Sequence, residues 1–184
     1  MKWNRKFVYP KSIRSTDNGI RRYLIGEKKL PSVTSILDAT KSEEDKAALA
    51  NWVERTGLKE SEAIVKAASS RGSKMHAYLE SFLLGRENLS FFDDNEQYKI
   101  MAKQIIEKGL INRFEEVWGV ECTLYKPDSY SGTCDAVGVY DGRESIIDFK
   151  QSNKPKKFEY IDSWLLQTAA YSLAHNTVYN SNIT

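Results

Sequence analysis

Charged residues interrupt a stretch that otherwise has the pattern of a buried strand, SIIDFKQSNKPKK over Ser145–Lys157. Its first residues are β-branched or aromatic, which favours a strand, whereas Asp148 and Lys150 belong to the residue types least often buried. Side chains alternate along a strand, so this carboxylate and this ammonium group share one face. The pattern is compatible with a charged functional site on a sheet and equally with an exposed ion pair on its solvent face.

A hairpin signal upstream brings a second aspartate to the same face. Asp141-Gly142 is a strong signal for a two-residue loop, and a ladder counted outward from it places Asp135 directly opposite Asp148; a three-residue loop would shift this pairing by one. Carboxylates opposed in this way, with Cβ atoms roughly 4.5–5.5 Å apart, repel each other unless one is protonated or a cation lies between them. A hard divalent cation such as Mg²⁺ fits two carboxylates and several waters. A lysine beside it suits a phosphate oxygen or an attacking water.

The elements that must position these residues fall into three parts of the chain. The sequence pattern predicts a basic, aromatic hairpin or arm for residues 1–30 and a helical region for residues 31–117. It predicts a sheet core with a last helix for residues 118–184. This order predicts an α/β fold of the α+β sandwich kind, with helices against a small mixed sheet. The expected turns lie at Asn18-Gly19 and Gly26. The sequence also predicts a short helix or strand end in residues 31–40, a helix from the N-cap Ser42 to Arg55 closed by Gly57, either one helix in residues 58–85 or two with a break around Ser69–Ser73, and helices at Asp93–Val117 and Tyr160–Ala174. The expected strands are Val120–Tyr125, Thr133–Tyr140, Glu144–Lys150 and the beginning of another in TVYNSNIT.

Composition is ordinary for a globular protein and bounds the possible functions. The 184 residues suit one domain, and a formal net charge of +2 leaves any nucleic-acid surface to local clustering of basic residues. The two cysteines, Cys122 and Cys134, exclude a disulfide framework and a four-cysteine iron–sulfur site, which favours reduced thiols and a cytosolic compartment. No apolar run approaches the roughly 18 residues of a membrane span. The basic, aromatic N-terminus favours a strand or arm over a targeting segment.

Five blocks of sequence, taken together and in order, resemble the PD-(D/E)XK nuclease superfamily and more closely its RecB-type exonuclease branch. The blocks are LPSVTSIL, RGSKMHAYLE, GTCD, IDFKQSNKPKK and LLQTAAY, and they extend from about Leu30 to Ala174. Within that branch they are similar to the mitochondrial genome maintenance exonucleases and their phage relatives. The resemblance implies a restriction-endonuclease-like fold and a nuclease that depends on Mg²⁺ or Mn²⁺. Cys134 stands where the family has the proline of its PD motif.

The resemblance also implies roles for particular residues of this chain. Asp135 and Asp148 would be metal ligands, together with His76 and the carbonyl of Phe149. Lys150 would position or help to deprotonate the attacking water and stabilise negative charge on the phosphate. Taken alone, His76 would be interpreted as a structural histidine; among these blocks the ligand role is favoured, since imidazole is a common metal ligand.

Further residues complete the predicted site. Gln167 and Tyr171 lie four residues apart on one helix face; in the family such a pair orients the lysine and contacts the nucleic-acid backbone, and ordinary helix-to-sheet packing is the alternative. Glu121 is either an auxiliary acid or an exposed edge carboxylate, and Glu80 either supports the metal site or is solvated. The residues predicted to contact nucleic acid are Arg21, Arg22, Arg71 and three lysines that could equally form a solvated loop, Lys154, Lys156 and Lys157.

These observations predict a metal-dependent DNA exonuclease that acts on single strands or free ends. DNA is the expected partner, and the expected state is a monomer in the cytoplasm of a bacterial or phage-infected cell. Two alternatives stay open: a sequence- or structure-specific endonuclease of the same superfamily, for which 184 residues leave little room, and a catalytically inactive DNA-binding module. The chain is expected to end either as a fragment or just before a further strand.

Overall fold

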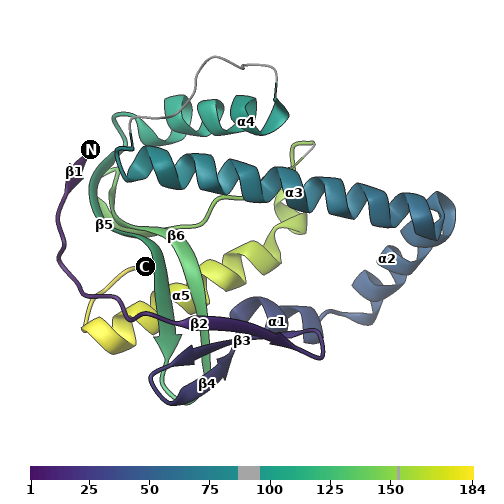
Figure 1. Ribbon diagram of the computed structural model, residues 1–184, viewed down its shortest axis with the longest axis horizontal. Helices are drawn as coiled ribbons and strands as arrows, with labels where there is room; N and C mark the ends of the chain where they lie inside the picture. Colours follow the sequence, from purple (N-terminus) through teal and green to yellow (C-terminus); the bar gives the residue numbers. More distant parts are fainter. Residues whose placement is uncertain (87–95, 153) are drawn as a thin grey trace.

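A computed structural model describes residues 1–86, 96–152 and 154–184 (Figure 1). Within these ranges the central sheet has the order β1-β5-β6-β7, formed by Lys2–Trp3, Phe114–Lys126, Tyr130–Tyr140 and Arg143–Ile147. Strand β1 runs parallel to β5, whereas β5, β6 and β7 pair antiparallel, so the sheet is mixed. Helices pack on both of its faces. The predicted fold class, helices against a small mixed sheet, is confirmed.

A second, smaller sheet forms the N-terminal part. It contains β2 (Ile13–Asp17), β3 (Ile20–Ile25) and β4 (Lys28–Pro31), all antiparallel, where the sequence predicted a hairpin. Asn18 and Gly19 connect the first two strands with φ angles of 52° and 78°. Two successive positive φ angles are what a tight hairpin turn of matching twist requires, and Asn-Gly is the pair that adopts them most readily. The predicted turns at Asn18-Gly19 and Gly26 are confirmed.

Three helices follow this sheet. Helix α1 (Val33–Ala39) begins at the N-cap Ser32, and α2 (Glu43–Thr56) begins at the predicted N-cap Ser42, whose hydroxyl accepts the N–H of Asp45. Gly57, with a φ of 85°, ends α2, as predicted. Helix α3 (Leu58–Leu83) is continuous, which confirms the alternative of a single helix over the one with a break around Ser69–Ser73. Its glycine, Gly72, serves close packing instead: a Cβ there would lie 3.4 Å from Cγ of Gln151.

The next predicted helix is wrong at its C-terminal end. Helix α4 spans Gln97–Ile105 and continues as a π-helical turn, Ile106–Leu110, but residues from Phe114 onward belong to β5. The apolar spacing misled because Ile106, Leu110 and Phe114 all enter the same core although the chain reverses between them. The first residues of that prediction, 93–95, lie outside the described ranges.

The strands bear out the predicted hairpin register but not all of the predicted boundaries. Tyr140 pairs with Arg143 and Ala136 with Ile147, the register expected from the Asp141-Gly142 turn. Strand β7 ends at Ile147, so the prediction of a strand through residue 150 is wrong. The physical reason is that the next available backbone N–H, that of Phe149, donates to the side chain of Asp135 instead of to a neighbouring strand.

The C-terminal segment is helical further than predicted, and no strand follows within the described residues. Helix α5 spans Asp162–Tyr179 after a 3₁₀ turn at Phe158–Tyr160, and Asn180 ends it in the left-handed conformation. The last residues then fold back onto the helix, because the Asn176 side chain bonds both the N–H and the C=O of Ile183. The strand expected in TVYNSNIT is therefore wrong.

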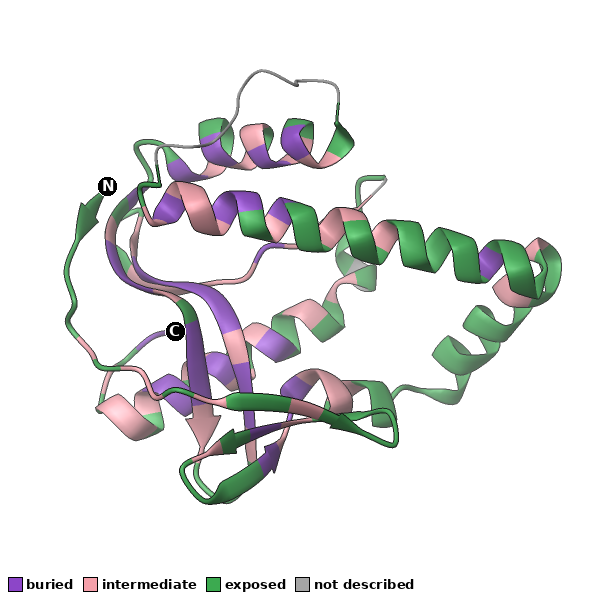
Figure 2. Cartoon of the chain, in the orientation of Figure 1, coloured by how far each residue is buried: buried purple, intermediate pink, exposed green. Residues whose placement is uncertain are grey.

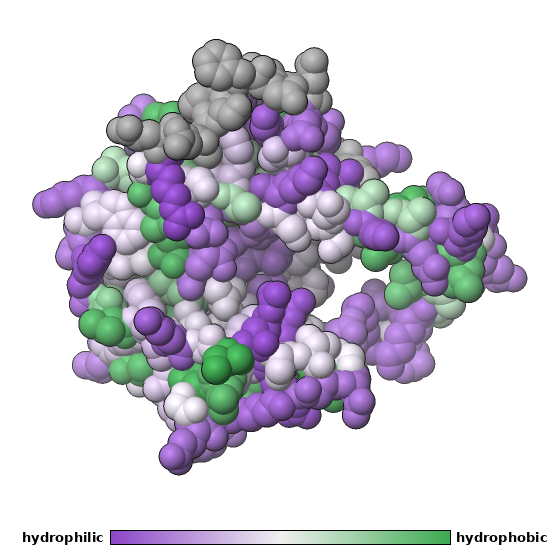
Figure 3. All heavy atoms as spheres, in the orientation of Figure 1, coloured by the Kyte–Doolittle hydropathy of each residue, from purple (hydrophilic) through white to green (hydrophobic). Residues whose placement is uncertain are grey.

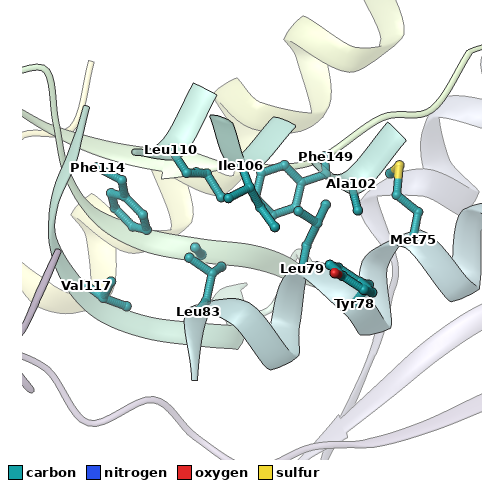
Figure 4. Close-up of a cluster of buried hydrophobic side chains, with 11 residues drawn as sticks. Met75, Tyr78, Leu79, Leu83, Ala102, Ile106, Leu110, Phe114, Val117 and Phe149 are labelled. Atoms are coloured by element: carbon teal, nitrogen blue, oxygen red, sulfur yellow. The ribbon is translucent and has the colours of Figure 1, made fainter. Parts of the chain in front are cut away.

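Two apolar clusters hold the sheet between its helices. One lies under α3 and α4 and contains Met75, Leu79, Leu83, Phe114 and Phe149 (Figure 4). The other lies under α1 and α5. Figure 2 shows the buried residues concentrated on the sheet and on the helix faces next to it, whereas α2 contains no buried residue. None of the helices in the described ranges is both long and apolar enough to cross a lipid bilayer.

Candidate metal and nucleic-acid site

A cleft of about 820 Å³ opens where β7 ends. It is bounded by β3, by the middle of α3, by β5 and β6, by the segment after β7 and by the first half of α5. Figure 3 shows the molecule hollowed beside the arm formed by α2 and the N-terminal half of α3. The polar side chains that line the cleft include His76, Glu80, Glu121, Asp135, Asp148, Lys150, Gln167 and Tyr171.

Asp135 lies at the centre of the contacts in the cleft, and each of its two carboxylate oxygens has a partner. It lies on β6 and is buried, and its Oδ1 is 2.7 Å from Nδ1 of His76 on α3. Its other oxygen accepts the backbone N–H of Phe149. The hydrogen bond to Asp135 raises the pKa of His76, and the negative charges of Asp135 and Asp148 act in the same direction. The structure thus joins three separate predicted residues, His76, Asp135 and Phe149, in one set of contacts.

Glu121 lies beside this pair. Val120 pairs with Ala136 and Cys122 with Cys134, so Glu121 and Asp135 occupy the same level of neighbouring strands. One ligand atom each of His76, Glu121 and Asp135 can be chosen so that all three lie within 4.8 Å of one another. Although Glu121 is largely exposed, partial burial of its carboxyl and the charge of Asp135 raise its pKa to about 7. Of its two sequence interpretations, the structure favours the acid of the site.

Asp148 lies in the same cleft but outside this tight group. Its side chain is almost buried, and the ammonium group of Lys150 contacts its Oδ2. The amide of Gln167 donates to its Oδ1 over 3.2 Å and also to the hydroxyl of Tyr171 over 3.1 Å. Burial raises the pKa of Asp148, against the opposing effect of Lys150. Because β7 ends one residue earlier, Asp148 is not part of the ladder opposite Asp135, where the hairpin count placed it.

The donor set fits a divalent cation. One imidazole nitrogen and two carboxylate oxygens are ligands that Mg²⁺, Mn²⁺ and related ions take in proteins. The acids are crowded: the pKa values of Glu121 and Asp148 are both raised, so a cation would stabilise their charged forms. Oδ2 of Asp148 is buried, and its partner in the described part of the chain is the ammonium group of Lys150. The identity of the metal does not follow from this arrangement.

Gln167 and Tyr171 hold their positions through close packing against β6. The ring of Tyr171 lies on the backbone of Gly132, where a Cβ would be only 2.5 Å from its Cε1 atom. Both side chains are buried, and burial raises the pKa of the Tyr171 hydroxyl. The glycine of the GTCD block therefore has a steric role: it leaves room for the tyrosine that supports Gln167 and, through it, Asp148.

The predicted nucleic-acid contacts separate into two groups. Arg21 lines the cleft from β3. Arg71 borders the cleft, because its Nε donates over 3.1 Å to Gln151, which is part of the cleft lining. Arg22 follows Arg21 on the strand, so its side chain is directed to the opposite face. Arg14, which the sequence interpretation left out, also lines the cleft; its pairing with Tyr23 across the hairpin was the available signal.

The basic residues near the site continue into a neighbouring cleft. Lys154 and Lys156 line this second cleft, which also contains Lys150. Lys157 follows them and is exposed. The predicted lysine cluster is thus adjacent to the candidate site, on the side away from β3.

The chain was compared with protein families and with individual proteins. No family model matches it. It is 30% identical over 167 residues to mitochondrial genome maintenance exonuclease 1 of Homo sapiens, which covers 84% of this chain and 46% of that protein. The protein of the same name from Mus musculus is 30% identical over 132 residues, covering 69% of this chain and 38% of that protein. The chain therefore spans less than half the length of these relatives. These matches make it a distant homologue of mitochondrial genome maintenance exonuclease 1 and confirm its predicted kinship with the RecB-like branch of the PD-(D/E)XK nucleases.

Proposed function

We propose that the chain is a metal-dependent DNA exonuclease that hydrolyses phosphodiester bonds in single strands or at free ends. The observation that carries this proposal is the convergence of His76, Glu121 and Asp135 in one cleft with Lys150. The homologues carry the word exonuclease in their names, which supports the reaction class. A cleft with both a metal donor set and a lysine offers the two kinds of positive charge that phosphoryl hydrolysis uses.

The residues of the cleft would divide the work as follows. His76, Glu121 and Asp135 would hold the metal, and Asp148 stays a predicted further ligand. A bound divalent cation lowers the pKa of a coordinated water and neutralises charge on the phosphate. The carbonyl of Phe149 stays a predicted ligand.

Lys150 would act on the phosphate and on the water. Asp148 contacts its ammonium group, and the amide of Gln167 fixes Asp148 from the other side. Tyr171 in turn accepts a hydrogen bond from that amide. This chain of contacts limits where the ammonium group can lie, so it can donate to a phosphate oxygen as negative charge develops there, an interaction that preorganised donors supply without further rearrangement.

The proposed partner is DNA, and its proposed path includes the N-terminal sheet. Arg14, Arg21 and Tyr23 line the cleft from β2 and β3. The guanidinium groups suit the phosphates of the DNA backbone, which gives binding without sequence preference, whereas Tyr23 is buried and offers no stacking face. A monomer and a cytoplasmic location stay predictions; the word mitochondrial in the names of the homologues describes those proteins.

A digestion experiment tests this function. Single-stranded DNA carrying a label at either the 5′ or the 3′ end is incubated with the full chain and Mg²⁺ or Mn²⁺, with and without EDTA. We expect cleavage that EDTA abolishes, and no cleavage of a circular single strand of the same sequence. Cleavage of the circle would identify an endonuclease. No cleavage with either metal would support the inactive DNA-binding module instead.

A further inference from the structure

A second cleft, of about 570 Å³, lies on the other side of Lys150 from the metal donors. It is formed by α3, by α4 and the π-helical turn, by the segment after β7 and by the first turn of α5. Lys150, Gln151 and Trp164 line both clefts. The two spaces therefore adjoin each other at the lysine that would contact the scissile phosphate.

The floor of this second cleft is apolar. Met75 is buried beneath it, and Met101, Ile105 and Trp164 are half-buried along it. An indole ring and thioether side chains form a surface that a flat heteroaromatic ring can pack against. The volume lies within the range of ordinary small-ligand sites, roughly 300–1,000 Å³.

Its rim is basic. Lys108, Lys154 and Lys156 are exposed, and none of them forms an ion pair with another residue in the described ranges of the chain. The apolar floor complements the flat ring of a nucleotide base, and the three lysines complement the negative charge of its phosphate. An acidic peptide would match the rim but not the flat floor, and a lipid tail would match the floor but not the lysines.

We propose that this second cleft binds one nucleotide of the DNA strand, the one next to the scissile phosphate. Its base packs against Trp164 and Met101, and the phosphate on its far side lies among Lys108, Lys154 and Lys156. This inference rests on the proposed function, because the position of the scissile phosphate follows from the proposed role of Lys150. It adds a specific base-stacking site on the side of the lysine opposite to β3.

A binding experiment tests the cleft without any need for cleavage. The full chain is titrated with deoxyadenosine 5′-monophosphate, and binding is followed by calorimetry. We expect Trp164→Ala to bind roughly 5- to 100-fold more weakly, the range that the loss of one stacked base costs. The double variant Lys154→Gln/Lys156→Gln should also bind more weakly; both lysines are exposed, so this variant tests the cleft without a folding defect.

Matched controls are available on the same chain. Phe158 is 74% exposed on the same connecting segment, so Phe158→Ala should bind like the unmodified protein, and so should Lys59→Gln, at an exposed position in the first turn of α3. Inorganic phosphate should compete only weakly, because it cannot stack. The inference would be overturned if the Trp164 and lysine variants bound the nucleotide as tightly as the unmodified protein does. It would also be overturned if inorganic phosphate competed as strongly as the nucleotide itself.

A second experiment separates failure of this inference from failure of the proposed function. Hydrolysis is measured on oligonucleotides with an abasic site at each position near the labelled end. We expect one position at which the missing base slows the unmodified protein but causes no further loss in Trp164→Ala. Hydrolysis that is indifferent to every abasic position would refute the base site alone. Mononucleotide binding that depends on Trp164, without hydrolysis by any variant, would uphold the base site and refute the nuclease.

Discussion

Burial and the nearby charge of Asp135 hold the pKa of Glu121 near 7. Such a value is typical of a carboxyl that would gain from a cation, since a metal favours the charged form. Glu121 also has an unusual backbone, with a φ of 50°, at a position level with Asp135 on the neighbouring strand. A residue with positive φ that is not glycine is uncommon, and such positions often occur at functional sites.

Glu121→Gln tests whether this carboxylate binds the metal. The amide keeps the size of the side chain but loses the charge, so we expect the Mn²⁺ concentration for half-maximal hydrolysis to rise by about ten-fold or more. A titration of activity against Mn²⁺ measures it. Glu107→Gln, at an exposed position of the π-helical turn, is the control and should leave the titration unchanged. If Glu121→Gln showed the same Mn²⁺ dependence as the unmodified protein, Glu121 would be an exposed edge carboxylate and not a metal ligand.

Asp148→Asn tests the contact with Lys150, the lysine proposed to act in catalysis. The asparagine keeps a hydrogen bond to Gln167 but cannot hold the ammonium group of Lys150 by charge. We expect metal-dependent cleavage to fall by about 100-fold or more, whereas the Kd for single-stranded DNA changes little, because the arginines of the cleft are untouched. Asp128→Asn, in an exposed ion pair with Lys28, is the matched control. Normal turnover by Asp148→Asn would remove this acid from the proposed mechanism.

At the scale of elements, the contact between β6 and α5 decides where Gln167 lies. Gly132→Ala places a methyl group 2.5 Å from Cε1 of Tyr171, so the ring must shift away from the strand. We expect a loss of about 1–3 kcal/mol in the free energy of unfolding, typical of overpacking, together with reduced hydrolysis. Gly109→Ala, whose new Cβ would meet Cγ2 of Ile105 at 4.0 Å, is the control and should cost far less. Chemical denaturation measures both; equal stability of the two variants would contradict this account.

Local signals predicted the elements that local chemistry determines. The Asp141-Gly142 turn fixed the register of β6 and β7, and Ser42 and Gly57 marked the ends of α2. What could not be predicted depends on contacts distant in sequence. The end of β7 is decided by a side chain of β6, and Glu121 reaches the site through a pairing of β5 and β6 whose register shifts twice before it.

At the scale of the whole molecule, His175 of α5 contacts both the N-terminal arm and the C-terminal tail. It is buried, its Nε2 lies 3.1 Å from the hydroxyl of Tyr9 in the N-terminal arm, and its Nδ1 lies 2.6 Å from the hydroxyl of Ser181 in the C-terminal tail. The ring of Phe7 packs edge-on against the imidazole of His175, with the two ring centroids 4.9 Å apart. Burial lowers the pKa of His175 to about 4.

This lowered pKa predicts a loss of stability in mild acid. The unfolded chain binds the proton near the ordinary value of 6.5, whereas the folded chain resists it until about pH 4. Stability from this group is therefore complete above pH 6.5 and falls as the pH drops, by about 2 kcal/mol between pH 7 and pH 5. Urea denaturation at both pH values measures the loss. His175→Gln removes the titrating group, so its loss should be smaller by that amount; an identical pH dependence in both proteins would contradict the assignment.

The arm formed by α2 and the N-terminal half of α3 has little to hold it in the isolated molecule. Helix α2 has no buried residue, and Leu49, Leu58 and Val65 are all more than half exposed. A helix with few buried contacts opens locally at low cost. We expect the amides of α2 to exchange with deuterium much faster than those of β6, in the middle of the sheet. Addition of single-stranded DNA should slow exchange in the arm if the strand lies in the hollow beside it, whereas protection confined to β2 and β3 would place the DNA on the N-terminal sheet alone.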